Sequence, residues 1–160
     1  MRRVYVAAGS NVQPRPNLQL AMRLLRNEFD DLVVSRAYSN IAIGFEGEDF
    51  INLVVGFTTA LELPELLQTL HRVETACGRP RDAAKWAPRS MDLDLLLYGE
   101  VVGQFPGAQL PRPDLLRRAF MLGPLSEIAP NVRHPTEALT IAQLWAAFDQ
   151  TAHPMTPVEL

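Results

Sequence analysis

The order of apolar runs in the first hundred residues restricts the possible folds more than any other feature of this sequence. Four apolar runs have the character of strands: 4–8, 32–38, 50–61 and 91–99. Two segments, 17–29 and 64–77, instead repeat apolar side chains every three or four positions, as amphipathic helices do. The resulting order is strand, helix, strand, strand, helix, strand. We therefore expect an α+β fold, a ferredoxin-like β-α-β-β-α-β sandwich in which an antiparallel sheet carries helices on one face.

The last third of the chain differs in composition from the rest. Its prolines between residues 106 and 135 exclude long regular elements there. Thr140 and Gln143 have the spacing of a capping box and predict a final helix that begins at this point. The tail, residues 152–160, holds two prolines and is expected to fray. We expect one domain over residues 1–160, with an elaborated C-terminal third.

The bulk composition excludes several classes of partner. A net charge of -3 gives no general attraction to nucleic acid or to an anionic membrane. No apolar run approaches the roughly 20 residues that span a bilayer, and the N-terminal run is too short for the core of a signal peptide. The single cysteine, Cys77, cannot form an internal disulfide, which favours a reducing compartment. We expect a cytoplasmic protein with neither a nucleic-acid nor a membrane partner. A monomer is expected as well, although none of these features determines the oligomeric state.

Basic residues concentrate in one part of the chain. Of the 15 lysines and arginines, all but Lys85 are arginines, and eight lie between Arg72 and Arg118. Codon usage is an ordinary explanation for the preference for arginine, but it does not explain the local concentration. Because the planar guanidinium group binds phosphate oxygens in pairs, this concentration suggests a phosphate-binding site.

Two aspartates, Asp92 and Asp94, stand at the start of the last strand of the sandwich, in the stretch MDLDLLLYG. Side chains alternate along a strand, so the two carboxylates share one face, while Leu93, Leu95 and Leu97 share the other and pack under the helices. Two acids this close repel each other unless a cation neutralises them. A solvated strand edge is the alternative, but the arginines and the tryptophan just upstream favour a site. Hard oxygen ligands suit magnesium, which binds one or two carboxylates together with phosphates, and we interpret the two acids as magnesium ligands.

The stretch KWAPRSMDLDLLLYG, residues 85–99, closely resembles the signature of the 6-hydroxymethyl-7,8-dihydropterin pyrophosphokinase (2-amino-4-hydroxy-6-hydroxymethyldihydropteridine diphosphokinase) family, R-W-x-P-R-x-x-D-x-D followed by apolar residues. Lys85 stands where that pattern commonly has arginine. The resemblance covers nearly the whole chain and includes AAGSN (7–11), FIN (50–52), RVETACGRPR (72–81) and RRAFMLGPLSEIAP (117–130). It implies an enzyme of folate biosynthesis that transfers the diphosphate of ATP to the hydroxymethyl group of 6-hydroxymethyl-7,8-dihydropterin, giving AMP and the pterin diphosphate.

The same resemblance implies a role for each matching position. Asp92 and Asp94 would hold two magnesium ions, and Arg79 and Arg89 would stabilise the phosphate charge during transfer. The ATP site would be lined by six residues: His71, Glu74, Arg81, Trp86, Arg112 and Arg118. The pterin site would also be lined by six: Asn40, Ile41, Ile43, Phe50, Asn52 and Phe120. Diphosphoryl transfer depends on in-line positioning and neutralised charge, and the sequence accordingly shows no Ser-His-Asp or Cys-His set.

The chain departs from the family pattern at three places. Arg112 stands where members usually carry a histidine, Asn40-Ile41-Ala42 where they tend to have a threonine and prolines, and His71 where glutamine is more usual. These departures leave three alternatives open: a catalytically altered paralogue, a pterin- or nucleotide-binding module, or an enzyme of a related pterin pathway. A nucleotidyltransferase is disfavoured, because such enzymes place Gly-Ser and the paired acids close together in sequence.

Overall fold

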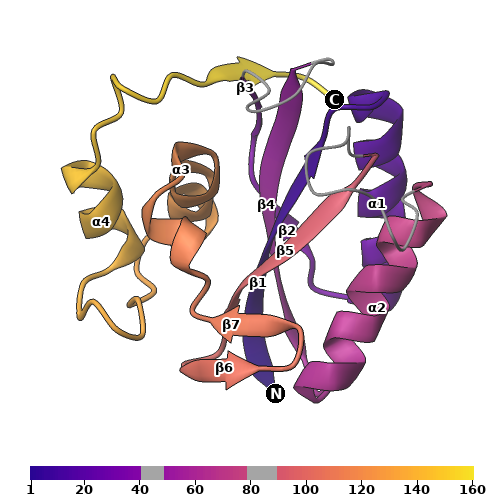
Figure 1. The fold of residues 1–160 in the computed structure, drawn as a ribbon, viewed down its shortest axis with the longest axis horizontal. Helices are drawn as coiled ribbons and strands as arrows, with labels where there is room; N and C mark the ends of the chain where they lie inside the picture. The colour runs from indigo at the N-terminus through magenta and orange to yellow at the C-terminus, as the bar shows by residue number, and fades with distance from the viewer. Residues whose placement is uncertain (41–48, 79–89) are drawn as a thin grey trace.

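An antiparallel β-sheet forms the centre of the molecule. A computed structural model describes residues 1–40, 49–78 and 90–160. The sheet has the strand order β5-β1-β4-β3-β8, with the short β2 beside β4 (Figure 1). Each pairing between these strands is antiparallel. The strands of this sheet are β1 (Arg2–Ser10), β2 (Val33–Val34), β3 (Ala37–Asn40), β4 (Phe50–Thr59), β5 (Asp92–Tyr98) and β8 (Thr156–Val158).

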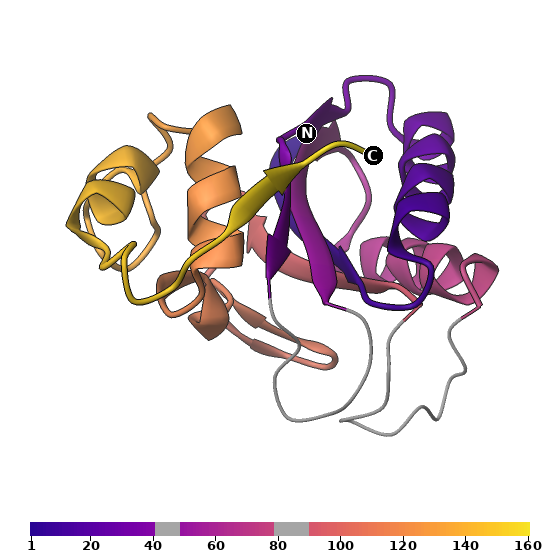
Figure 2. The same cartoon turned by 90° about the horizontal axis from the view of Figure 1, so that it is seen from above.

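Helices cover both faces of the sheet. α1 (Pro14–Glu28) and α2 (Leu63–Ala76) lie on one face, and α3 (Ala119–Ile128) and α4 (Ile141–Ala147) lie on the other, as Figure 2 shows. The predicted element order, and the antiparallel sheet with α1 and α2 on one face, are confirmed. The C-terminal third adds a further layer of helices on the second face. In the part of the chain that the structure describes, no helix has the length and apolar character needed to cross a membrane.

Both helices of the sandwich have a proline in their first turn. Pro14 opens α1 and Pro64 lies in the first turn of α2, where the missing N–H group would have no intrahelical partner in any case. Gly78 follows α2 with a φ of 91° and ends the helix as predicted. The helices bury the apolar stripes seen in the sequence: Leu18, Ala21, Met22 and Leu25 of α1, and Leu66, Leu70 and Val73 of α2.

β1 is longer than the sequence predicts. It continues through Gly9 and Ser10, where the sequence predicts a turn, because both residues pair with β4 and Gly9 also pairs with β5. The backbone of Gly9 therefore lies inside the sheet, with a neighbouring strand on each side.

A bulge in β5 divides its leucines between the two faces of the sheet. The register between β1 and β5 shifts at this point, so that Leu96 is an extra residue on β5. Leu93 and Leu95 pack with α1 and α2, whereas Leu96 and Leu97 pack with α3. The prediction that Leu97 shares a face with Leu93 and Leu95 is wrong, because the bulge reverses the alternation after Leu95.

The last third of the chain contains more regular structure than its prolines predict. A hairpin of β6 (Gly103–Phe105) and β7 (Ala108–Leu110) precedes a short 3-10 helix, η1 (Pro113–Leu116). α3 is ten residues long although Pro124 lies inside it. Most of α3 is buried against the sheet, and this burial offsets the backbone hydrogen bond that Pro124 cannot donate.

The end of the chain is ordered by specific contacts. The predicted capping box is present: Thr140 Oγ1 accepts from the Gln143 N–H at 3.2 Å, and Gln143 Oε1 accepts from the Thr140 N–H at 2.9 Å. Within the tail that is expected to fray, Thr156–Val158 forms β8, which pairs with β3. The Arg15 side chain also donates a hydrogen bond of 2.9 Å to the carbonyl of Glu159, which ties this strand to α1.

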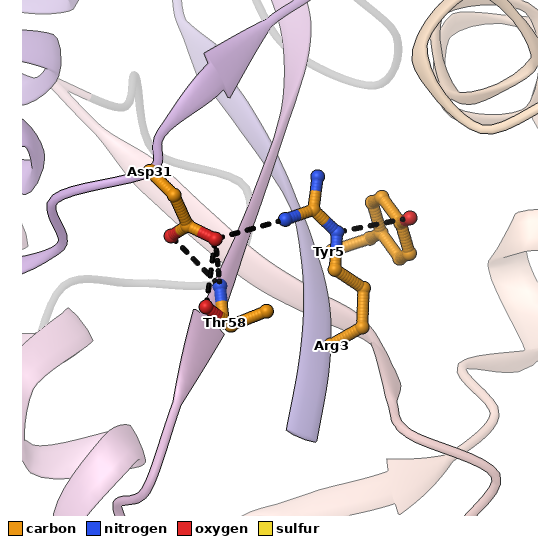
Figure 3. A network of polar contacts seen from close by, with 4 residues as sticks. All are labelled: Arg3, Tyr5, Asp31 and Thr58. Atoms are coloured by element: carbon orange, nitrogen blue, oxygen red, sulfur yellow. Dashed lines mark hydrogen bonds and ion pairs between the residues drawn. The ribbon is translucent and has the colours of Figure 1, made fainter. Parts of the chain in front are cut away.

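A polar network fastens one end of the sheet (Figure 3). The carboxylate of Asp31 accepts hydrogen bonds from the Thr58 N–H at 3.0 Å and the Thr58 hydroxyl at 2.7 Å, and from Arg3 at 3.2 Å. Arg3 also donates to the Tyr5 hydroxyl. The hydrogen bonds from Thr58 hold the pKa of Asp31 below its ordinary value. Because Arg3 lies near the start of β1 and Gly9 near its end, the network lies at the opposite end of the sheet from Gly9.

Candidate active site

Asp92, Gly9 and Asn52 form a row across three neighbouring strands. Asp92 on β5 pairs with Gly9 on β1, and Gly9 pairs with Asn52 on β4. Directly paired residues of antiparallel strands share a face, so Asp92 and Asn52 project from the same face, with the Gly9 backbone between them. With strands about 4.8 Å apart, their Cα atoms are separated by about 10 Å. An acid and an amide can therefore contact different parts of one bound molecule.

Asp92 and Asp94 project from the same face of β5, as the alternation predicts. Asp94 pairs with Ala7, two positions along β1 from the partner of Asp92. Both aspartates are half-buried, whereas Leu93 between them is buried under the helices. Two adjacent carboxylates are a hard oxygen donor set, and this chemistry fits Mg²⁺.

Glu74 on α2 holds the start of β5 in place. Its Oε2 accepts a 2.8 Å hydrogen bond from the N–H of Leu93, and its Oε1 lies 3.2 Å from Nδ1 of His71. Glu74 is only 6% exposed, whereas the side chain of His71 is 79% exposed. Hydrogen bonds to a charged acceptor are stronger than those between neutral groups. Glu74 therefore positions the strand that carries both aspartates.

Arg112 brings a positive charge to Asp94. Its Nη2 lies 3.6 Å from Oδ1 of Asp94 and 3.4 Å from Oδ2 of Asp114. The backbone N–H of Arg112 donates a 3.0 Å hydrogen bond to the carbonyl of Leu96 on β5. The segment after β7 is thus attached to β5, and this attachment places the guanidinium group beside the carboxylate.

A cavity of about 200 Å³ lies between α2, β5 and the β6–β7 hairpin. Four predicted site residues line it: His71, Glu74, Asp94 and Arg112. Leucines of α2 and β5 and residues 107–109 of the hairpin line the rest. A wall that combines apolar side chains with a few charged groups is typical of small-molecule sites.

The predicted amide and one predicted aromatic residue lie on the other side of Gly9. Asn52 is 6% exposed, and its Nδ2 donates a hydrogen bond to Oδ1 of Asn40 on β3. A Cβ atom at Gly9 would collide with Oδ1 of Asn52, so the missing side chain makes room for the amide. Phe50 pairs with Asn40 across β3 and β4 and is half-buried. An amide beside an aromatic ring suits the edge and the face of a flat heterocycle.

The other two described residues of the predicted site lie at the start of α3, Phe120 in its first turn and Arg118 at the position before the helix. Phe120 is half-buried against the apolar cluster below α3, and Arg118 is exposed at the N-terminus of this helix. The Tyr38 hydroxyl on β3 donates a hydrogen bond to Glu127 of α3. Burial, followed by this bond to Glu127, raises the pKa of Tyr38 to about 12. The contact holds α3 against the sheet and so positions Phe120.

Comparison with known proteins assigns the chain to a family. The sequence profile of 7,8-dihydro-6-hydroxymethylpterin-pyrophosphokinase (HPPK) matches residues 5–130. Two bacterial proteins named 2-amino-4-hydroxy-6-hydroxymethyldihydropteridine pyrophosphokinase are similar over most of their length. The protein of Pseudomonas aeruginosa is 37% identical over 139 residues, which cover 84% of this chain and 85% of the relative. The protein of Aquifex aeolicus is 39% identical over 137 residues, with the same coverage of 84% and 85%. This chain belongs to the HPPK family.

Solved structures agree with the fold of an HPPK. The crystal structure of Plasmodium falciparum HPPK-DHPS with SDX-DHP is similar with a TM-score of 0.69 and 12% sequence identity. The similarity covers 91% of this chain and 43% of that longer chain. The predicted ferredoxin-like fold is confirmed, as are the family resemblance and the interpretation of the chain as a pyrophosphokinase.

Several predicted site residues fall outside the structure's described ranges: Ile41, Ile43, Arg79, Arg81, Trp86 and Arg89. Within residues 1–40, 49–78 and 90–160, no group of three or more His, Cys, Asp or Glu side chains is arranged to hold a metal ion. The pair of aspartates on β5 remains the predicted metal site.

Sequence reasoning misses Asp114 and leaves the role of Gly9 open. No local pattern distinguishes Asp114 from an ordinary turn acid, because its contact with Arg112 depends on how the segment after β7 folds. The hairpin that borders the cavity could have been predicted from the sequence, because Pro106-Gly107, between β6 and β7, is a typical turn dipeptide.

Proposed function

We propose that this HPPK transfers the terminal diphosphate of ATP to the hydroxymethyl group of 6-hydroxymethyl-7,8-dihydropterin. The hydroxymethyl oxygen attacks the β-phosphorus, the bond between this phosphorus and the oxygen of the α-phosphate breaks, and AMP leaves with that oxygen. The hydroxyl proton is released to solvent. The observation that carries the proposal is that Asp92 and Asp94 share one sheet face with Asn52, next to a cavity lined by Asp94, Arg112 and His71.

Asp92 and Asp94 would hold magnesium, two ions in our proposal, which when bound would neutralise charge on the phosphate oxygens. Both carboxylates are half-buried, so they remain accessible to a solvated cation. The hydrogen bond from Leu93 to Glu74 keeps their strand in place during the reaction. Positioned charge of this kind is the main catalytic requirement for transfer of a phosphoryl group.

The remaining residues divide into two groups. The ATP group comprises His71, Glu74, Arg81, Trp86, Arg112 and Arg118, with Arg79 and Arg89 on the transferring phosphates. The pterin group comprises Asn40, Ile41, Ile43, Phe50, Asn52 and Phe120, with the two phenylalanines on opposite faces of the ring. The described members support this division, because His71, Glu74 and Arg112 line the cavity beside β5 while Asn40, Phe50 and Asn52 lie on β3 and β4. We further propose that the chain acts as a cytoplasmic monomer.

The test is the identity of the nucleotide product. The protein is mixed with ATP, magnesium and 6-hydroxymethyl-7,8-dihydropterin, and the nucleotides are separated by chromatography. AMP supports diphosphoryl transfer, ADP would indicate an ordinary kinase, and neither would indicate a binding module. Asp92→Ala and Asp94→Ala should each lower kcat by a factor on the order of 10³, because several kcal/mol of charge stabilisation is lost.

A matched control removes an acid far from the site. Asp30 is exposed in the turn after α1, so Asp30→Ala makes the same change in charge without touching β5. Its turnover should equal that of the unmodified protein. Full activity in Asp92→Ala or Asp94→Ala would rule out the proposed metal ligands.

A further inference from the structure

Arg112 lies between two carboxylates, and its distance to each is longer than a full hydrogen bond. Its Nη2 is 3.6 Å from Asp94 and 3.4 Å from Asp114. Charge-assisted hydrogen bonds between nitrogen and oxygen are shorter, about 2.7–2.9 Å. All three side chains are about one third exposed, at 35%, 32% and 35% for Arg112, Asp94 and Asp114. A shift of less than 1 Å would bring the guanidinium group into a full hydrogen bond with either acid.

The backbone restricts the movements that Arg112 can make. Its N–H is bonded to the carbonyl of Leu96, and Pro111 and Pro113 limit the backbone on both sides. The Nε atom is buried and has no hydrogen-bond partner among the described residues. The backbone of Arg112 is therefore held in place, and the end of the side chain is the part that can move from one carboxylate to the other.

A divalent cation on Asp94 changes the charge balance around Arg112. While Asp94 carries no metal ion, the guanidinium group is attracted by both acids. A metal ion bound to Asp94 neutralises that acid and repels the arginine, because the two cations would share one carboxylate. Asp114 belongs to the same segment as Arg112 and lies within reach of it, so it can hold the displaced group.

We propose that Arg112 is a counter-ion of Asp94 in the metal-free protein, and that Asp114 is a positioning residue that receives Arg112 when a divalent cation binds. This inference rests on the proposed function in one respect, namely that Asp94 is a metal ligand. Arg112 lowers the affinity of the empty site for metal, and Asp114 reduces that effect by drawing the guanidinium group away. The arginine released from Asp94 stays beside the cavity that it lines. Under the proposed function, it would there meet the phosphates of ATP.

The experiment measures binding of Mn²⁺ to the nucleotide-free protein by electron paramagnetic resonance. Arg112→Gln should bind Mn²⁺ about three- to tenfold more tightly than the unmodified protein, because an ion pair that competes with the metal is gone. Arg112→Lys, which keeps a positive charge at this position, should remain within about twofold of the unmodified protein. The matched control is Arg117→Gln, which removes an exposed arginine from the same segment and should leave the affinity unchanged.

Asp114 is tested in a double-mutant cycle with Arg112. Asp114→Asn should weaken Mn²⁺ binding about two- to fivefold, because Arg112 then pairs with Asp94 alone. The same substitution made in Arg112→Gln should have no effect, since Asp114 acts through Arg112. An equal loss in both backgrounds would show that Asp114 acts by its charge alone and would overturn its role.

Two results separate this inference from the proposed function. If Arg112→Gln binds Mn²⁺ no better than Arg117→Gln while Asp94→Asn loses binding, the counter-ion role is wrong and the metal ligand stands. If Asp94→Asn keeps the affinity of the unmodified protein, Asp94 is not a metal ligand, and both proposals fail at that residue. Circular dichroism of each variant confirms that the fold is retained before affinities are compared.

Discussion

The carboxylate of Glu74 on α2 accepts a 2.8 Å hydrogen bond from the backbone N–H of Leu93, the residue between Asp92 and Asp94. A side chain of the helix layer thus holds the sheet residue that separates the two proposed metal ligands. The bond is buried, so its loss leaves a polar group without a partner in the interior.

Glu74→Ala is expected to lower both stability and turnover. The free energy of unfolding should fall by about 1–3 kcal/mol, the usual cost of leaving a buried donor unsatisfied. Turnover should fall with it, because the start of β5 is no longer held. Glu74→Gln keeps an acceptor oxygen, so its free energy of unfolding and its turnover should fall less than those of Glu74→Ala. Urea denaturation and the AMP assay measure the two effects, and Glu65→Ala, an exposed acid on the same helix, is the control. Equal stability of Glu74→Ala and Glu65→Ala would contradict this role.

Gly9→Ala is expected to impair use of the pterin more than it impairs the fold. The added Cβ atom collides with the amide of Asn52, which is buried and bonded to Asn40. The KM for the pterin should rise on the order of tenfold, because the displaced amide of Asn52 can no longer orient the bound pterin. Gly56→Ala creates a similar collision with the ring of Tyr5, outside the predicted site, and should reduce stability without changing that KM. Identical KM values for the two variants would argue against the proposed pterin site.

The stability of the protein should fall in mildly acidic solution because of His134. This residue is 2% exposed, and burial lowers its pKa from the ordinary value of 6.5. Its Nδ1 accepts the Thr136 N–H at 3.2 Å, which requires an unprotonated nitrogen. Below pH 6.5 the unfolded chain therefore binds more protons at His134 than the folded chain does. The contribution of neutral His134 to the free energy of unfolding is complete above pH 6.5 and is lost as the pH falls toward the lowered pKa.

The variant His134→Asn isolates this effect, because an asparagine oxygen can accept the same hydrogen bond and does not titrate. We expect the free energy of unfolding to drop more steeply in the unmodified protein than in His134→Asn between about pH 7.5 and 5.5. Parallel pH profiles would show that His134 does not contribute.

Asp31→Asn should reduce stability near neutral pH without affecting turnover. Thr58 and Arg3 stabilise the ionised carboxylate and lower the pKa of Asp31 from 3.8. This stabilisation is present above that value and is lost as the pH falls through the lowered pKa, so the two proteins should converge in acid. Thermal unfolding at several pH values measures the difference. A change in AMP formation would contradict the placement of this network away from the active site.

Patterns of local spacing predict much of this structure. The stripes of α1 and α2, the capping box at Thr140 and the shared face of Asp92 and Asp94 all follow from side-chain periodicity, which neighbouring residues determine. The family motif lies in one continuous stretch, so it too is visible without a structure. Features that the spacing does not predict have the opposite character. Leu97 changes face because of pairing with another strand, and residues 156–158 form a strand because they pair with the edge of β3.

The candidate site also has a part that the sequence predicts and a part that depends on tertiary contacts. The sequence predicts that residues 92, 94, 74 and 112 serve one reaction. The sequence alone determined the order of elements, the faces of the helices and the two carboxylates on one strand, because these depend on steric rules over a few residues. Only the tertiary structure decided that Glu74 meets Leu93, that Asn52 lies over Gly9, and that Arg112 stands between Asp94 and Asp114. Such contacts join segments far apart in the chain, and their geometry depends on how the whole sheet and its two helix layers pack together.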